Sequence, residues 1–421
     1  MTAQLHLDRR AALLAAAGLG LSVSFLGRRA FAAADGALAR RKLVVFVCRG
    51  AMDGLSVSPP VGDPVYAALR GEIAIAGFGQ PNGALPLDAT FGLHPKLTAI
   101  HALAQKGQAR IAPAVATPDR ARSHFEAQDV LETGAAGVYG QTSGWLNRAM
   151  QAMGPAGRVQ ALSVGAQAPL ILRGALQAAS WSPGGYKDRD SRLPAILADL
   201  YAHDPLLGPA LASGLATEAM ARIAAAPMAG PMAAASQADP AQTVAGYQRA
   251  GIATARSLGL TLANFMTEPG GPQIAAVSLD GFDTHANQGA AEGQLANHLA
   301  YLDAAVDGLA SGLGPEWANT VALAATEFGR TARINGTKGT DHGTGSTALV
   351  LGGGLKRGGI IGDWPTLQTA RLFENRDTYP ALDMRALFKG VLAEQLGLGR
   401  RALDTAVFPD STGVEPVRGI V

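Results

Sequence analysis

Short, mainly apolar runs recur along the chain, and each predicts a strand; the continuous run over 43–48 predicts a strand that is buried on both faces of a sheet. The clearest runs cover residues 43–48, 109–115, 274–279, 321–325 and 347–351, and weaker ones cover 159–164 and 169–172. Each clear run adjoins a loop with polar side chains. The pattern therefore predicts a buried sheet whose strand ends carry the chemistry.

Helical periodicity alternates with these runs. Leucines and a valine recur at helical spacing between residues 295 and 313, which predicts an amphipathic helix. Further helices are predicted over 240–266 and 383–396. Alternating strands and helices are typical of an α/β fold with a mainly parallel sheet and helices on both faces. We expect a single domain, 33–421, with a helical Ala-rich insertion over roughly 180–266.

The first residues have the pattern of an export signal. Arg9 and Arg10 precede an apolar run over 11–27, and a small-x-small pattern follows at 30–32. This arrangement predicts a twin-arginine signal peptide, 1–32, that is removed on export to the periplasm or beyond. The alternative is a membrane anchor, but the run is rich in Ala and Gly and is short for a span of about 20 residues.

Charge and cysteine content fit an exported protein. The predicted leader holds four arginines and one aspartate, so the rest of the chain carries a net charge of about −1 against +2 for the whole. We expect no nucleic-acid partner, because no cluster of Lys and Arg marks such a surface. We expect no membrane span after residue 32. A single cysteine, Cys48, excludes an intrachain disulfide, which suits a protein that folds before export.

Histidines and carboxylates gather in the loops at predicted strand ends. His124, His285 and His342 each lie within four residues of a carboxylate. Mixed imidazole and carboxylate donors suit zinc, manganese or iron. Asp283 and His285 extend from the same side of one segment, and Asp341 precedes His342 directly. Because ligands bind at the carboxyl ends of strands in such sheets, we expect these loops to meet there.

One such pair alone is more typical of a hydrogen-bonded loop than of a ligand set. Two pairs on successive elements, with Glu327 between them, support a metal site and a hydrogen-bonded loop equally. The residues by themselves leave both interpretations open.

Ser123 is a candidate nucleophile, since a serine hydroxyl can be activated by a base or a metal. Arg122 and His124 flank it and could bind or orient an anion. The alternative is an N-cap, because Ser123 and Glu126 have capping-box spacing. The two roles are compatible, since a helix N-terminus also binds anions. No Gly-x-Ser-x-Gly elbow is present, which disfavours a metal-free serine hydrolase.

Six segments together resemble a known family. They are Val-Cys-Arg-Gly-Ala-Met-Asp-Gly (47–54), Arg-Ser-His-Phe-Glu-Ala-Gln-Asp (122–129), Gly-Trp-Leu-Asn-Arg (144–148), Asp-Gly-Phe-Asp-Thr-His-Ala-Asn-Gln (280–288), Thr-Glu-Phe-Gly-Arg-Thr (326–331) and Gly-Thr-Asp-His-Gly-Thr-Gly-Ser (339–346). The chain is identified by them as a member of the bacterial family DUF1501, labelled sulfatase-like and placed in the alkaline phosphatase-like superfamily. The resemblance implies an alkaline phosphatase-like fold.

The resemblance also implies one or two divalent ions, zinc or manganese, near a nucleophile. Ser123 is similar to that nucleophile, and the loop 280–285 is similar to an Asp-to-His ligand loop in which Asp280 or Asp283 is the ligand. The segment 341–345 is similar to the superfamily's last ligand loop. Asp53 lies near the place of the first-strand ligand, with Arg49 beside it.

Two departures from the superfamily pattern affect the expected chemistry. Phe328, after Glu327, stands where a histidine ligand is usual, so one metal site is expected to be degraded or replaced. No Cys-x-Pro-x-Arg sequence is present for formylglycine formation, which argues against an ordinary sulfatase mechanism.

These observations predict a metal-dependent hydrolase of small phosphate or sulfate esters. Ser123 is expected to attack, His124 to assist it, and Arg49 or Arg122 to neutralise the anion. The expected metal ligands are drawn from Asp53, Asp280, Asp283, His285, Glu327, Asp341 and His342. The alternative is a catalytically eroded member of the same fold that binds a secreted protein partner, with residues 207–242 as its surface.

Overall fold

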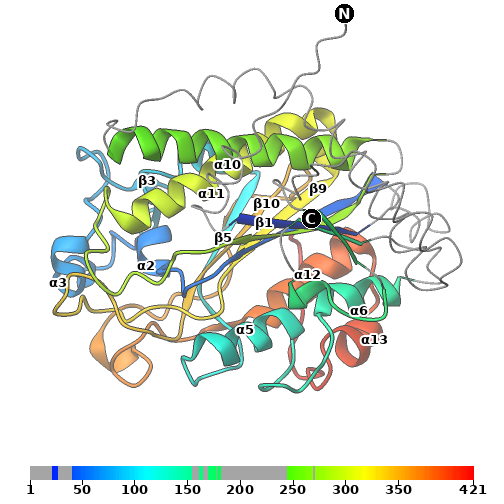
Figure 1. Ribbon diagram of the computed structural model, residues 1–421. Coiled ribbons are helices and arrows are strands. Elements are labelled where there is room, and N and C mark those ends of the chain that lie inside the picture. The colour runs from blue at the N-terminus through cyan, green and yellow to red at the C-terminus, as the bar shows by residue number, and fades with distance from the viewer. Residues whose placement is uncertain are drawn as a thin grey trace, which may run out of the picture.

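The computed structural model describes residues 21–26, 40–153, 161–164, 169–176, 178–181, 244–268 and 271–421. In this part of the chain, a ten-stranded sheet has the order β11-β5-β10-β9-β2-β8-β1-β6-β7, and β12 also pairs with β5 (Figure 1). The strands are β1 (Leu21–Leu26), β2 (Lys42–Cys48), β5 (Ala109–Ala116), β6 (Ala161–Val164), β7 (Ala178–Trp181), β8 (Ile274–Leu279), β9 (Thr320–Ala325), β10 (Ser346–Leu351), β11 (Gly359–Ile360) and β12 (Leu382–Asp383). A separate hairpin pairs β3 (Leu85–Pro86) with β4 (Gly92–Leu93).

Eight of the ten strands of this sheet run in the same direction, and β1 and β10 run against them. β2 lies between β8 and β9 and runs parallel to both. β10 is antiparallel to its neighbours β5 and β9, and β1 is antiparallel to β6 and β8. The prediction of an α/β fold with a mainly parallel sheet is confirmed.

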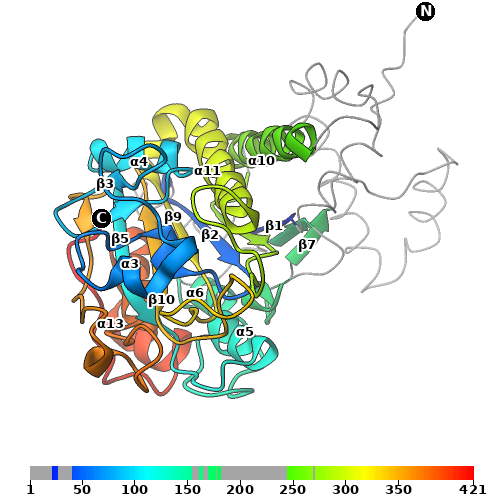
Figure 2. The ribbon, with the colours of Figure 1, turned by 90° about the vertical axis from the view of Figure 1, so that its left-hand side faces the viewer.

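Helices cover both faces of the sheet. One face carries α4 (Thr98–Gln105), α10 (Val244–Thr267) and α11 (Gln294–Leu313). The other carries α5 (His124–Thr133), α6 (Trp145–Ala152), α12 (Met384–Leu396) and α13 (Arg400–Ala402). The short helices α2 (Gly54–Val57) and α3 (Tyr66–Arg70) lie at one end of the sheet. Figure 2 shows the layers from the side, with α11 above the sheet and α5 below it.

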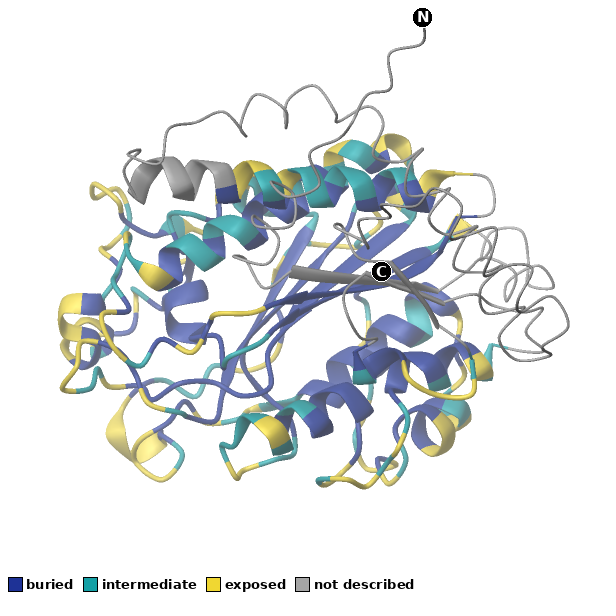
Figure 3. Cartoon of the chain, in the orientation of Figure 1, coloured by how far each residue is buried: buried dark blue, intermediate teal, exposed yellow. Residues whose placement is uncertain are grey.

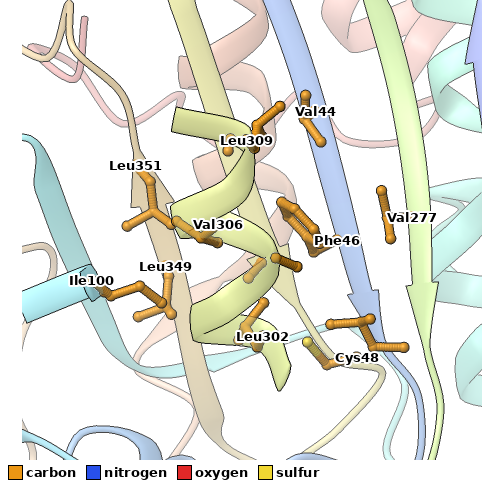
Figure 4. Close-up of a cluster of buried hydrophobic side chains, with 14 of the residues drawn as sticks. Val44, Phe46, Cys48, Ile100, Val277, Leu302, Val306, Leu309, Leu349 and Leu351 are labelled. Carbon is orange, nitrogen blue, oxygen red and sulfur yellow. The ribbon is translucent and has the colours of Figure 1, made fainter. Parts of the chain in front are cut away.

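The alternation of side chains along β2 explains why both faces are apolar. Val44, Phe46 and Cys48 pack on the side of α11, where α10 and α4 complete one core (Figure 4). The intervening residues belong to a second core with α6 and α12. Successive strand residues point to opposite faces, so a continuous apolar run serves both layers. The strands β2, β5, β8, β9 and β10 are accordingly buried along their whole length, and most exposed residues lie on the outer helices and loops (Figure 3).

The predicted elements at 43–48, 109–115, 274–279, 321–325, 347–351, 295–313 and 383–396 are all present to within about two residues at each end. The prediction of a strand over 169–172 is wrong. Leu170–Leu172 forms a 3₁₀ helix instead, closed by the Leu172 N–H to the Pro169 carbonyl at 3.1 Å. Four apolar residues are too few for periodicity to separate a strand from a helical turn.

Two predicted segments, the insertion and the leader, lie partly outside the described residues. Of the expected insertion, residues 182–243 lie outside the described residues, and 244–267 form α10. Within the expected leader, Leu21–Leu26 forms β1, between β8 and β6. Cleavage of the leader stays a prediction. No described helix is both long and apolar enough to span a membrane.

The buried His94 predicts a pH-dependent stability. Its Nε2 donates to the Ala290 carbonyl at 3.0 Å and its Nδ1 accepts from the Lys96 N–H at 3.1 Å. Burial lowers the pKa of His94 to about 4, so the unfolded chain binds the extra proton between about pH 6.5 and 4. The free energy of unfolding therefore falls by about 3 kcal/mol as pH drops through this window. Denaturant titrations of wild type and His94→Gln at pH 7 and pH 4 check this; equal losses in both proteins would contradict it.

Candidate metal centre

The polar loops meet at one edge of the sheet because of its topology. β2, β8 and β9 run in parallel, so the residues that follow them lie at the same edge. β5 runs in the same direction as β9, because both are antiparallel to β10. β10 runs the opposite way, so the loop before it lies at this edge. The loops after β5, β8 and β9 and the loop before β10 therefore converge.

Three histidines surround the carboxylate of Asp283. Its Oδ1 lies 3.0 Å from Nε2 of His285 and 3.2 Å from Nε2 of His342. Its Oδ2 lies 3.4 Å from Nε2 of His124. The two Nε2 atoms of His285 and His342 are 3.0 Å apart. Each of the three rings thus presents Nε2 to a carboxylate oxygen of Asp283.

The other ring nitrogen of each histidine faces outward to an oxygen. Nδ1 of His124 lies 2.8 Å from Oε1 of Glu327, and Nδ1 of His342 lies 2.9 Å from the backbone carbonyl of Arg122. Nδ1 of His285 lies 3.5 Å from Oδ1 of Asp341. Glu327 and Asp341 were both expected to be ligands. The structure places each beside the Nδ1 of a histidine, on the side of the ring away from Asp283.

Arg330 is the buried cation of the site. Its Nη1 donates to Asp283 Oδ1 at 2.5 Å, and its Nε donates to the Thr340 hydroxyl at 3.1 Å. Thr340 in turn donates to Gln288 Oε1 at 2.8 Å, and Gln288 Nε2 donates to Asp53 Oδ2 at 2.7 Å. A chain of hydrogen bonds therefore fixes Asp283 to the interior.

Charge and burial set the protonation of the cluster. Burial alone would raise the pKa of Asp283, but hydrogen bonding and the charge of Arg330 hold it below its ordinary value. Burial lowers the pKa of His342. The hydrogen bond to Glu327 raises the pKa of His124. An ionised aspartate and a neutral imidazole are the forms that bind metal ions, so the pKa shifts of Asp283 and His342 favour metal binding, whereas at His124 an ion has to displace a proton.

Phe328 forms a wall of the site. Its ring, only 3% exposed, lies with its centroid 5.0 Å from those of both His124 and His342. Sequence comparison with the superfamily pattern marked Phe328 as a lost ligand. In the structure it restricts the planes of two neighbouring imidazoles by packing.

Several predicted site residues have other partners. Asp53 is buried, caps α2 and is ion-paired with Arg70. Arg49 is ion-paired with Glu132. Asp280 is exposed and lies outside the group of His124, Asp283 and His342, whose donor atoms lie within 4.8 Å of one another.

The residues around the predicted nucleophile are placed as follows. Arg122 contacts Asp377 at 2.8 Å and Glu374 at 2.5 Å, so its charge is engaged by carboxylates. Ser123 is the N-cap residue of α5 by its backbone, but its side chain makes no capping hydrogen bond. The capping box with Glu126 is therefore not formed, and the half-buried hydroxyl of Ser123 has no role in closing the helix.

The donor set fits a borderline divalent ion. Imidazole nitrogens and a carboxylate oxygen are ligands of zinc, manganese and iron. Nε2 of His124 is buried and has no hydrogen-bond partner, although it faces the cluster. Buried polar atoms are almost always paired, so an unpaired one marks a place for a further ligand. His124, Asp283 and His342, whose donor atoms lie within 4.8 Å of one another, are the residues that could hold the ion. His285 lies beside Asp283 and His342 but outside this group of three.

Sequence analysis missed two residues of this arrangement. Arg330 lies within the segment 326–331 that carried the family resemblance, and a charged residue in the loop after a buried strand was the available signal. Gln288 is the last residue of the segment 280–288, which also carried the family resemblance and also follows a buried strand. His124 was assigned to catalysis, and the structure places it among the candidate ligands.

Comparison with known proteins gives a family without an assigned activity. No curated protein and no solved structure matched the chain. A family described as a protein of unknown function matches residues 40–407, which include every residue of the candidate metal centre. The chain belongs to the family DUF1501.

Proposed function

We propose that this protein is an exported, metal-dependent hydrolase of phosphate or sulfate esters with an alkaline phosphatase-like fold. The observation that carries the proposal is the orientation of His342. A backbone carbonyl can only accept a hydrogen bond, so the ring donates from Nδ1 to Arg122 and, when neutral, has a bare lone pair on Nε2. That lone pair faces Asp283 Oδ1, also an acceptor, at 3.2 Å. His285 Nε2 lies 3.0 Å from the same nitrogen, and Arg330 donates to the same carboxylate oxygen. A divalent ion bound here would be shared by the His342 lone pair and the Asp283 carboxylate.

The proposed ligands are Nε2 of His124 and His342 with a carboxylate oxygen of Asp283. Zinc or manganese, as one or two ions, is the proposed metal. Such an ion, when bound, stabilises developing negative charge on an ester oxygen and lowers the pKa of a bound hydroxyl. Arg330 contributes by holding Asp283 ionised and in place.

Ser123 is the proposed nucleophile, and three features support this role. It directly precedes His124 in the chain, its hydroxyl is not used as a cap, and it lies at the N-terminus of a ten-residue helix. Backbone N–H groups at such an end favour an anionic group. Its Oγ would form a bond to phosphorus or sulfur as the alcohol leaves, and water would then release the anion. Arg49 and Arg122 are engaged by Glu132 and Asp377, so we propose structural roles for them.

We expect Ser123→Ala to lower hydrolysis of an aryl phosphate or aryl sulfate by at least about 100-fold while metal content is unchanged, because the bond-forming oxygen is removed. The measurement is release of the phenol, with bound metal counted by elemental mass spectrometry. Ser311→Ala, on α11, is the matched control and should retain full activity.

Unchanged hydrolysis by the metal-loaded Ser123→Ala protein would remove this serine from the reaction. Wild-type protein that binds metal but hydrolyses neither ester would favour the alternative, an eroded member of the fold that binds a secreted partner.

A further inference from the structure

The carboxylate of Glu327 is held by three separate segments of the chain. It follows β9 and is fully buried. Its Oε1 accepts hydrogen bonds from the Gly50 N–H at 2.9 Å and from Gln128 Nε2 at 3.3 Å, and its Oε2 accepts from the Thr326 hydroxyl at 3.0 Å. Oε1 also meets Nδ1 of His124 at 2.8 Å. These contacts fix its position independently of any ion.

The contact with Glu327 determines what His124 offers to the cluster. A carboxylate in this position accepts a hydrogen bond from the Nδ1–H, so the lone pair of the neutral ring lies on Nε2. Nε2 is buried, has no hydrogen-bond partner and lies 3.4 Å from Asp283 Oδ2. The ring is also held by Phe328 and His342, with centroids 5.0 and 4.5 Å away.

We propose that Glu327 is a positioning residue for a metal ion, and that it acts through His124 without binding the ion itself. This inference rests on the proposed function. A carboxylate that accepts from the outer nitrogen of a ligating histidine fixes its tautomer and direction and raises its basicity. Glu327 thereby makes His124 Nε2 a ligand beside Asp283 and His342, the three residues whose donor atoms lie within 4.8 Å of one another.

A second histidine of the cluster shows the same arrangement with a different acceptor. His342 Nδ1 donates to the carbonyl of Arg122 at 2.9 Å. Arg122 has φ of 57°, in the left-handed region that non-glycine residues rarely adopt. Its ion pairs with Glu374 and Asp377 stabilise this conformation and the direction of its carbonyl. Outer acceptors thus orient both rings inward.

A double-mutant cycle on zinc affinity tests this role. The dissociation constant for Zn²⁺ is measured by chelator competition for wild type, Glu327→Gln, His124→Ala and the double variant. Glutamine keeps the shape and an acceptor oxygen but loses the charge. We expect Glu327→Gln to weaken binding at least about 10-fold in the wild-type background, as loss of an outer partner does. In the His124→Ala background the same substitution should change nothing, because two residues that act as one unit are not additive.

Glu132→Gln is the matched control. Glu132 is a buried carboxylate, 2% exposed, on the same helix as His124, but its partners among the described residues are Arg49 and the Ile171 N–H. It should leave the Zn²⁺ affinity unchanged.

Each remaining outcome separates the two proposals. An unchanged affinity in Glu327→Gln, or an equal loss in both backgrounds, would overturn the positioning role while leaving the metal centre intact. Wild-type protein that binds no Zn²⁺ would overturn the metal centre itself.

Discussion

Asp283→Asn is expected to lose metal binding almost completely. The carboxylate lies within 3.4 Å of Nε2 of three histidines, so it supplies the charge around which the site is arranged. Asparagine keeps the shape and can still accept from Arg330, which preserves the fold around the substitution. We expect the affinity to fall by more than the roughly 10- to 100-fold that removal of an outer partner causes. Metal per chain, counted after purification without a metal column, measures this.

Asp280→Asn is the control for this prediction. Asp280 belongs to the same loop and is exposed, as Asp283 is, but it lies outside the cluster. It should keep the wild-type metal content. The reverse result, with metal lost in Asp280→Asn and retained in Asp283→Asn, would show that the loop binds the ion through the other aspartate.

Asp53→Ala is expected to destabilise the protein by about 3–5 kcal/mol, because it leaves a buried guanidinium without its counter-charge. The side chains of Arg70 and Asp53 are 0% and 1% exposed, and Asp53 also accepts from Ser56 at 2.9 Å and from Gln288. Urea denaturation of the apo proteins measures the loss.

The exposed ion pair of Lys96 and Glu292 gives the comparison. These side chains are 33% and 68% exposed, and Glu292→Ala should cost less than about 1 kcal/mol of unfolding free energy.

The milder variant Asp53→Asn should bind metal like wild type, since Asp53 lies in the interior network and not among the histidines. Loss of metal in a folded Asp53→Asn protein would return Asp53 to the ligand set.

The strands of the fold could be predicted because their burial is complete. β2, β8 and β9 are covered by helices on both faces, so their sequences are almost entirely apolar. The order of the strands could not be predicted in the same way. Nothing local to residues 346–351 distinguishes a strand antiparallel to its neighbours from a parallel one, since its two faces are equally buried.

The location of the candidate site could be predicted from the sequence better than the role of each residue in it. The loops with His285 and His342 were expected at one edge, and the structure brings them together. Which carboxylate faces inward depends on distant residues. Asp53 and Glu327 both follow buried strands, yet Arg70 and His124 give them different tasks. Pairs of residues that are distant in the chain produce no recognisable spacing in the sequence.

The antiparallel strand β10 also has a consequence for the order of folding. Its start places His342 in the cluster, whereas His124 follows β5, so no single hairpin or βαβ unit contains both ligands. Contacts between segments so distant in the chain form late, because the intervening chain must first be closed. An ion would then find its full set of donors only when the central sheet is assembled. Uptake of the ion during refolding should keep pace with the slowest phase of sheet formation and lag behind the initial collapse of the chain.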